Sequence, residues 1–206
     1  MTLRAFGSLF GETYGNPPPR VLALHGWGRT RGDFDTLLSG YDALAVDLPG
    51  FGASPPPDHP IGAAGYARLM EPALAEFDLP PVVVGHSFGG RVGVALAAAH
   101  PESVSGLVLV GVPLLRRVGP KPGVPWKYRL IRGARRLGLI PEERLERARK
   151  EHGSADYRAA SGVMRDILVT AVNETYEHEL GTLTCPVRLV WGERDSAAPL
   201  TIARAA

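Results

Sequence analysis

The sequence predicts an α/β protein built on a mostly parallel central sheet. Short, unbroken apolar runs rich in β-branched residues alternate with longer stretches of helical character. This pattern is typical of a parallel sheet with helices on both faces. Each apolar run ends in glycine, proline and polar residues. Because the loops at the carboxyl ends of such strands usually hold the chemistry, we expect the functional site in these loops.

Five apolar runs are expected to form the core strands. In chain order they are Val21–Leu24, Tyr41–Val46, Val82–Val84, Val104–Val110 and Val187–Trp191. Helices are expected from Ile61 to Asp78 and from Gly90 to Ala99. The length of 206 residues suits one domain with room for an inserted lobe, and 45% hydrophobic residues can form a substantial core.

One segment, residues 114–180, breaks this alternation. It contains no clear strand run and carries 14 Lys/Arg against 9 Asp/Glu, a net charge of +5. Helices are expected at Glu142–Glu151 and Tyr157–Glu179. We interpret the segment as a helical lid inserted into a core made of residues 1–113 and 181–206. Its arginine cluster is interpreted as a solvated helix face, with contact to an anionic substrate or carrier as the alternative. The cluster comprises Arg129, Arg132, Arg135 and Arg136.

The composition argues against several classes of protein. A net charge of +2 gives no overall drive toward nucleic acid or an anionic membrane. No apolar run reaches the ~18 residues of a membrane span, and the first residues lack the apolar region of a signal peptide. A cytoplasmic protein is therefore expected. The single cysteine, Cys185, is expected to be a buried structural thiol, and neither a metal nor a cofactor is expected.

The most informative stretch is Gly85-His86-Ser87-Phe88-Gly89-Gly90, directly after an apolar run. A run that stops at Gly-x-Ser-x-Gly and continues into a helical stretch predicts a strand, a sharp turn and a helix. That geometry lifts the Ser87 hydroxyl above the end of the sheet. A side chain at Gly85 or Gly89 would collide with the neighbouring strand or helix. We interpret Ser87 as a nucleophile, the alternative being a small residue in a tight turn.

A serine nucleophile needs a base, a group that orients the base, and donors for the oxyanion. The backbone N–H of Phe88 is the expected first donor. The second is expected from Trp27 in His25-Gly26-Trp27-Gly28, which follows the first core strand. The Trp27 indole is also expected to line an acyl pocket, the alternative being a core aromatic that anchors the loop.

The orienting acid is assigned to Asp195, which follows the last apolar run. The alternatives are Glu193, with Arg194 as an ion-pair partner, and a reading of Asp195 as an ordinary surface acid. The base is expected after the acid in this chain order, but the residues that follow Asp195 include no histidine.

All six histidines precede Asp195. We interpret His25 and His86 as structural supports beside the two oxyanion elements, and a swing of a lid histidine toward Ser87 as a remote alternative. The other four are His59, His100, His152 and His178.

With these motifs in place, the chain resembles the α/β-hydrolase superfamily, and the segment Asp47-Leu48-Pro49-Gly50-Phe51-Gly52-Ala53-Ser54 adds to the likeness. The resemblance implies an α/β-hydrolase fold with a helical lid. It covers nearly the whole chain outside the lid. The form His-Gly-Trp-Gly looks like that of carboxylesterases acting on pimeloyl-carrier-protein methyl ester. A serine at position 87 argues against the relatives whose nucleophile is aspartate.

Family members continue past the acid with a helix, a further strand, a histidine loop and a last helix. We therefore expect a C-terminally truncated sequence that lacks the last strand and helix. Val187–Trp191 would then be an exposed apolar edge, and one sheet face would lose part of its cover.

The expected function is a serine hydrolase that cleaves a small carboxylic ester or thioester, free or carrier-bound, through an acyl-serine. Its activity is expected to be weak without the histidine. The alternatives are a non-catalytic ligand-binding protein, and a C–C hydrolase, lyase or cofactor-free haloperoxidase on the same scaffold. Neither nucleic acid nor membrane is an expected partner, and the oligomeric state is left open.

Overall fold

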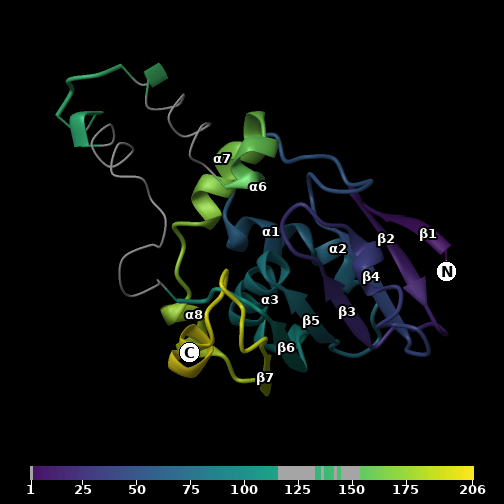
Figure 1. Cartoon of the computed structure of the whole chain (residues 1–206). Helices are drawn as coiled ribbons and strands as arrows, with labels where there is room; N and C mark the ends of the chain where they lie inside the picture. The colour runs from purple at the N-terminus through teal and green to yellow at the C-terminus, as the bar shows by residue number, and fades with distance from the viewer. Residues whose placement is uncertain (1, 116–132, 136, 142, 145–153) are drawn as a thin grey trace.

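A seven-stranded sheet forms the centre of the computed structural model, which describes residues 2–115, 133–135, 137–141, 143–144 and 154–206 (Figure 1). The strands run in the spatial order β1-β2-β4-β3-β5-β6-β7. Neighbours from β4 to β7 pair in parallel, whereas β2 pairs antiparallel with β1 and β4. The strands are β1 Thr2–Phe6, β2 Leu9–Tyr14, β3 Val21–Leu24, β4 Ala43–Asp47, β5 Val82–His86, β6 Gly106–Val110 and β7 Val187–Val190. The predicted α/β architecture is therefore confirmed.

The N-terminal hairpin of β1 and β2 was not predicted. Its turn passes through Gly7, whose φ is 61°. Buried and partly exposed side chains alternate along much of β2, so the strand lacks the unbroken apolar run of the inner strands. Such alternation is characteristic of a half-exposed antiparallel strand.

The two helices predicted to cover the sheet differ from expectation in opposite ways, because the first is divided into two shorter helices and the second begins two residues earlier. The single helix expected from Ile61 to Asp78 is instead α1 Ala63–Leu69 followed by α2 Glu71–Leu74. Pro72 lies in the first turn of α2, where its missing N–H is tolerated but cannot continue α1. Helix α3 spans Phe88–Ala99 and begins directly after Ser87. The short 3-10 helices are η1 Arg31–Phe34 and η2 Pro101–Ser103.

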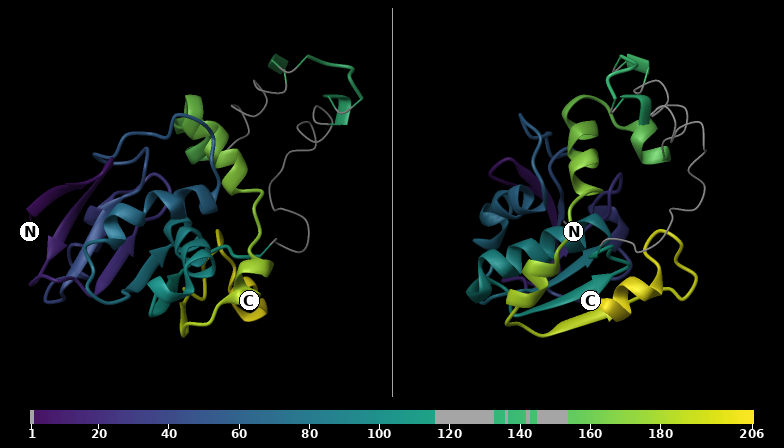
Figure 2. Two further views of the ribbon diagram at one scale, coloured as in Figure 1. Left: turned by 180° about the vertical axis from the view of Figure 1, so that it is seen from behind. Right: turned by 90° about the vertical axis from the view of Figure 1, so that its left-hand side faces the viewer.

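The predicted lid segment is described only in part. Its later half forms α6 Ala155–Ala159, α7 Gly162–Ala171 and α8 Glu177–Thr182, so the prediction of one helix over Tyr157–Glu179 was wrong. Extended backbone at Ala160 and Ser161 separates α6 from α7. The predicted helix 142–151 lies almost wholly outside the described residues. So do three arginines of the basic cluster, Arg129, Arg132 and Arg136. Figure 2 shows α7 descending toward α1 and α3.

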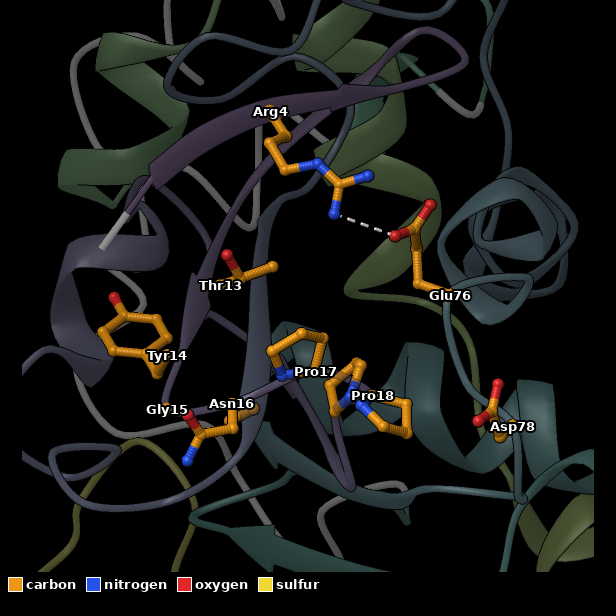
Figure 3. Close-up of a pocket in the computed structure, with 11 residues that line it drawn as sticks. Arg4, Thr13, Tyr14, Gly15, Asn16, Pro17, Pro18, Glu76 and Asp78 are labelled. Atoms are coloured by element: carbon orange, nitrogen blue, oxygen red, sulfur yellow. Dashed lines mark ion pairs between the residues drawn. The ribbon is translucent and has the colours of Figure 1, made fainter.

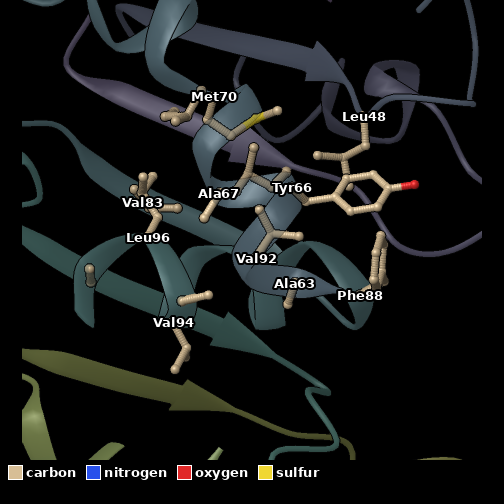
Figure 4. Close-up of a cluster of buried hydrophobic side chains, with 14 of the residues drawn as sticks. Leu48, Ala63, Tyr66, Ala67, Met70, Val83, Phe88, Val92, Val94 and Leu96 are labelled. Carbon is tan, nitrogen blue, oxygen red and sulfur yellow. The ribbon is translucent and has the colours of Figure 1, made fainter. Parts of the chain in front are cut away.

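The two faces of the sheet bury different amounts of apolar surface. The larger cluster lies under α1 and α3 and includes Tyr66, Met70, Leu96 and Val83 (Figure 4). Side chains one residue out of phase on β3 and β4, such as Ala23 and Ala45, point to the opposite face. There they pack with residues of η1 and the loop after it. Cys185 is half-buried against the larger cluster.

The far edge of the described sheet is β7, which covers most of the run Val187–Trp191. All four of its side chains are exposed, including Val190 at 50%. Helix α9, Leu200–Ala205, follows it. None of the helices that the structure describes combines the length and apolar character needed to cross a bilayer.

Candidate active site

Ser87 lies in a strained turn between β5 and α3. Its φ of 48° and ψ of −110° make it the one residue other than glycine with a positive φ in the described part of the chain. Such a backbone costs about 1–3 kcal/mol and persists only where its surroundings enforce it. The Ser87 N–H donates to the carbonyl of Val110 at 3.0 Å, and the Gly90 N–H donates to the Ser87 carbonyl at 3.1 Å. The neighbouring strand β6 and the first turn of α3 therefore hold this conformation.

Gly85 and Gly89 allow the close approach that this turn requires. A Cβ atom on Gly89 would lie 2.6 Å from the carbonyl oxygen of His25, and one on Gly85 would lie 2.7 Å from the Gly90 nitrogen. Both distances are far below van der Waals contact. The Gly89 N–H also donates to the His25 carbonyl at 3.0 Å. The serine turn is thus joined directly to the end of β3 and the loop that follows it.

His25 is fully buried and belongs to the framework of the site. Its Nδ1 donates to the Gly26 carbonyl at 2.7 Å, and its Nε2 accepts the N–H of Leu48 at 2.9 Å. This pair of bonds needs a neutral ring with its proton on Nδ1. Burial lowers the pKa of His25 below its ordinary value, which favours the same neutral form. His25 therefore ties the 25–28 loop to the loop after β4.

The neutral state of His25 predicts a pH dependence of stability. The unfolded chain binds this proton at about pH 6.5, whereas the folded state binds it only at lower pH. The stabilisation is therefore complete above that pH and is lost as the pH falls toward the folded pKa. In urea titrations, the free energy of unfolding is expected to decrease by up to about 1.4 kcal/mol for each pH unit by which the pH is lowered below about 6.5. A His25→Gln variant should give a flatter profile, and parallel profiles would contradict this role.

His86 is exposed at the end of β5, beside the same loop. A Cβ atom built on Gly26 would lie 2.8 Å from the His86 Nδ1 and 3.5 Å from the Ser87 Cβ. The absence of a side chain at Gly26 therefore lets the imidazole and the serine pack against the 25–28 loop. The structure brings His25, Gly26, His86 and Ser87 together, as their places in the two motifs suggested.

An aromatic cluster joins the two loops to the serine turn. The Trp27 ring makes edge contacts with Phe51, centroid to centroid 5.0 Å, and with Phe88 at 5.3 Å. Phe88 also contacts Tyr66 at 4.9 Å. Such pairs contribute beyond the area that they bury. Sequence reasoning did not single out Phe51 or Tyr66. Phe51 lies within the 47–54 motif, but Tyr66 had no local signal beyond its apolar position in a helix.

The backbone N–H groups of Trp27 and Phe88 flank this cluster. Among the described residues, neither N–H has a hydrogen-bond acceptor in the protein. The N–H of Phe88 is one of the unsatisfied donors in the first turn of α3.

A cavity of about 260 Å³ opens beside the aromatic cluster. Trp27 and Phe51 line its core side, and Met164 of α7 and Asp156 of α6 line the other side. The volume lies just below the usual range for small-molecule pockets, about 300–1,000 Å³.

A larger cavity of about 400 Å³ lies elsewhere (Figure 3). Its walls include Thr13, Pro17, Asp78 and an ion pair between Arg4 and Glu76 at 3.0 Å. Ala43, at the start of β4, also lines this cavity. It lies in register with Val82, the first residue of β5, whereas Ser87 comes directly after the last residue of β5. The larger cavity therefore opens at the opposite end of the sheet from the serine.

Asp195 lies in the turn after β7 and is partly buried. Its Oδ1 accepts the N–H groups of Ala197 at 2.8 Å and Ala198 at 2.9 Å. Its Oδ2 would lie 3.2 Å from a Cβ on Gly111, which follows β6. The carboxylate is thus at the carboxyl edge of the sheet, beside the end of β6, the strand next to β5, which ends just before Ser87. The alternatives named from the sequence are both exposed: Glu193 and Arg194.

The other histidines occupy varied places. His59 is in an exposed loop, His100 caps the end of α3, and His178 is exposed on α8. His152 lies outside the described residues. Within the described ranges, no group of three or more His, Cys, Asp or Glu side chains could hold a metal ion.

The strand–serine–helix turn at the carboxyl edge of a mostly parallel sheet defines the class of protein. The model of the α/β hydrolase fold family matches residues 19–159. The chain therefore belongs to the α/β hydrolase fold family, and it is a hydrolase. The predicted fold class and the resemblance are both confirmed.

Particular relatives refine this placement. Pimeloyl-[acyl-carrier protein] methyl ester esterase of Chromobacterium violaceum is 32% identical, over 96% of this chain and 84% of the relative. A 2-hydroxy-6-oxononadienedioate/2-hydroxy-6-oxononatrienedioate hydrolase of Cupriavidus pinatubonensis is 27% identical, over 88% of this chain and 72% of the relative. The structure of a hydrolase from Pseudomonas aeruginosa PA01 superposes with a TM-score of 0.67 at 20% identity, over 98% of this chain and 84% of that chain.

Proposed function

We propose that the chain is a serine hydrolase that cleaves a small carboxylic ester or thioester through an acyl intermediate on Ser87. The observation that carries the proposal is the strained φ of 48° at Ser87, held between β5 and α3 against the 25–28 loop. Strain of this kind is characteristic of functional sites. The similarity to the Chromobacterium violaceum esterase supports an ester as the substrate, free or attached to a carrier.

In this proposal each group has one role. The Ser87 Oγ attacks the carbonyl carbon of the ester and displaces its alcohol or thiol. The N–H groups of Phe88 and Trp27 stabilise the oxyanion of the tetrahedral intermediate. Asp195 is proposed to orient and stabilise an imidazole base wherever one is supplied. The 114–180 segment is proposed as the lid over a core formed by 1–113 and 181–206.

The histidine base is missing from the expected position in these 206 residues, because no histidine follows Asp195. In a polypeptide of these residues alone no imidazole stands at that place in the chain to take the serine proton, so we expect slow acylation. In a serine protease, loss of the histidine lowers kcat by about 10⁶-fold, as much as loss of the whole triad. A polypeptide of these residues is therefore proposed to turn over esters weakly.

An added base should restore part of this activity. Imidazole is expected to accelerate hydrolysis of p-nitrophenyl esters by the protein beyond the rate that imidazole gives alone. Ser87→Ala should abolish this excess, whereas Ser105→Ala, at an exposed serine, should retain it. An equal excess in the Ser87→Ala variant would contradict the proposal.

The same assay separates the reaction classes. Thioesters and vinylogous diketones are compared with the esters, the diketones because the Cupriavidus pinatubonensis relative is a hydrolase of 2-hydroxy-6-oxononadienedioate. Turnover of the diketones alone would favour carbon–carbon bond hydrolysis. Saturable binding with no turnover in the presence of imidazole would favour a non-catalytic ligand-binding protein.

A further inference from the structure

The C-terminal end of α7 is attached to the core by a partly buried arginine. Ala171 is the last residue of α7, and its carbonyl is among those that a helix leaves without an internal partner. The Nη1 of Arg91, one turn beyond Ser87 on α3, donates to this carbonyl. The Arg91 guanidinium also lies over the ring of Tyr176, 5.9 Å from its centroid.

A carboxylate makes the second attachment. Both oxygens of Glu174 lie 3.2 Å from the N–H of Ala63, the first residue of α1. The N-cap residue of α1 offers no side chain to this donor, so Glu174 supplies the cap from 111 positions along the chain. The hydroxyl of Tyr176 donates to the second oxygen of Glu174 at 2.8 Å. Arg91, Glu174 and Tyr176, here called the α7 anchor, thus join α7 to both α1 and α3.

The other end of α7 forms a wall of the cavity beside Trp27. Met164 lines that cavity and packs so closely on Gly50 that a Cβ atom there would overlap the Met164 Sδ. Met164 and Ala171 are separated by seven residues, about 10 Å along a rigid helix. Between them, Ile167 and Leu168 are buried against the core. A shift at the anchored end of α7 would therefore be transmitted to Met164.

We propose that the α7 anchor fixes the distance between Met164 and Trp27, so that Glu174 is a positioning residue that sets which acyl groups the cavity accepts. The effect on substrates rests on the proposed ester hydrolysis, whereas the effect on α7 does not. Glu174 touches no reacting atom and acts through the placement of α7.

The first test measures α7 directly by hydrogen–deuterium exchange. Glu174→Ala is expected to speed exchange in a peptide covering 162–171 by about tenfold and to leave β5 and β6 unchanged. Glu174→Gln, which retains one carbonyl acceptor, should show a smaller increase. Asp166→Ala, at an exposed position on α7, should show none. Unchanged exchange in α7, or an equal rise in every peptide, would overturn the proposal.

Tyr176→Phe keeps the test decisive if Glu174→Ala does not fold. It removes only the hydroxyl that donates to Glu174 and keeps the ring beside Arg91. Exchange in α7 should rise severalfold, again without change in β5. If it does not rise, the anchor is not what holds α7.

The second test compares p-nitrophenyl acetate with the octanoate in the presence of imidazole. Glu174→Gln is expected to change the ratio of their KM values severalfold while kcat for the acetate stays constant. Proportional loss on both esters would overturn the role in selection. Absence of turnover in every variant would instead refute the proposed function, and the exchange experiment would still decide the anchor.

Discussion

Replacing Gly89 with alanine is expected to destabilise the fold by about 3 kcal/mol or more. The new Cβ atom would lie 2.6 Å from the His25 carbonyl oxygen and still closer to the Leu24 carbonyl. Both are backbone atoms of β3 or its end, and β3 is hydrogen-bonded to β4 and β5 on its two sides. The strand cannot retreat without breaking the centre of the sheet, so the serine turn has to open.

Urea unfolding measures this loss, and Gly93→Ala on the same helix is the matched control. A Cβ atom there would lie 3.1 Å from a methyl group of Val83, a side chain that can shift by a few tenths of an ångström. The control should therefore lose much less stability. A Gly89→Ala variant as stable as the Gly93→Ala variant would contradict the close approach described for the turn.

Replacing Asp47 with alanine is expected to cost about 3 kcal/mol, the lower end of the effect of breaking a buried ion pair, because the Arg31 partner is only partly buried. The Asp47 side chain is fully buried. It accepts the backbone N–H of Arg31 at 2.8 Å, the Arg31 Nη1 at 2.5 Å and the N–H of Ala53 at 2.9 Å. The Arg31 Nε also lies 3.4 Å from Glu12. Asp47 thereby holds together the two loops that carry Trp27 and Phe51.

A double-mutant cycle with Arg31→Met isolates the pair. The double variant should be more stable than the sum of the two single losses predicts, because it leaves no unpaired buried charge. Asp33→Asn, which breaks the more exposed pair with Arg29, should change stability little. Additive losses in the cycle would show that the charge pair is not the source of the effect.

The inner part of the fold was predictable because strands buried on both faces leave a local signature. The runs at Val21–Leu24 and Val82–Val84 are unbroken and β-branched or aliphatic, and both form strands at those positions. The hairpin β1–β2 has mixed burial and was missed. The break before α2 shows a second limit, since one proline divided an otherwise continuous helical pattern.

The candidate site was predictable only where its residues lie in compact motifs. The spacing of the glycines around Ser87 predicted a turn between a strand and a helix, and the structure places Ser87 between β5 and α3. The cap that Glu174 provides for α1 and the contact between Tyr66 and Phe88 join distant parts of the chain. Nothing local in the sequence marks such contacts, because they depend on how helices and loops pack in three dimensions.

The role of Ser87 as nucleophile is tested most directly by labelling with a fluorophosphonate, followed by mass spectrometry of the peptides. Imidazole is added as the base. We expect a single adduct on the peptide that contains Ser87, with the same labelling in Ser105→Ala and none in Ser87→Ala. An adduct on another residue, or equal labelling of Ser87→Ala, would contradict the assignment of Ser87 as the nucleophile.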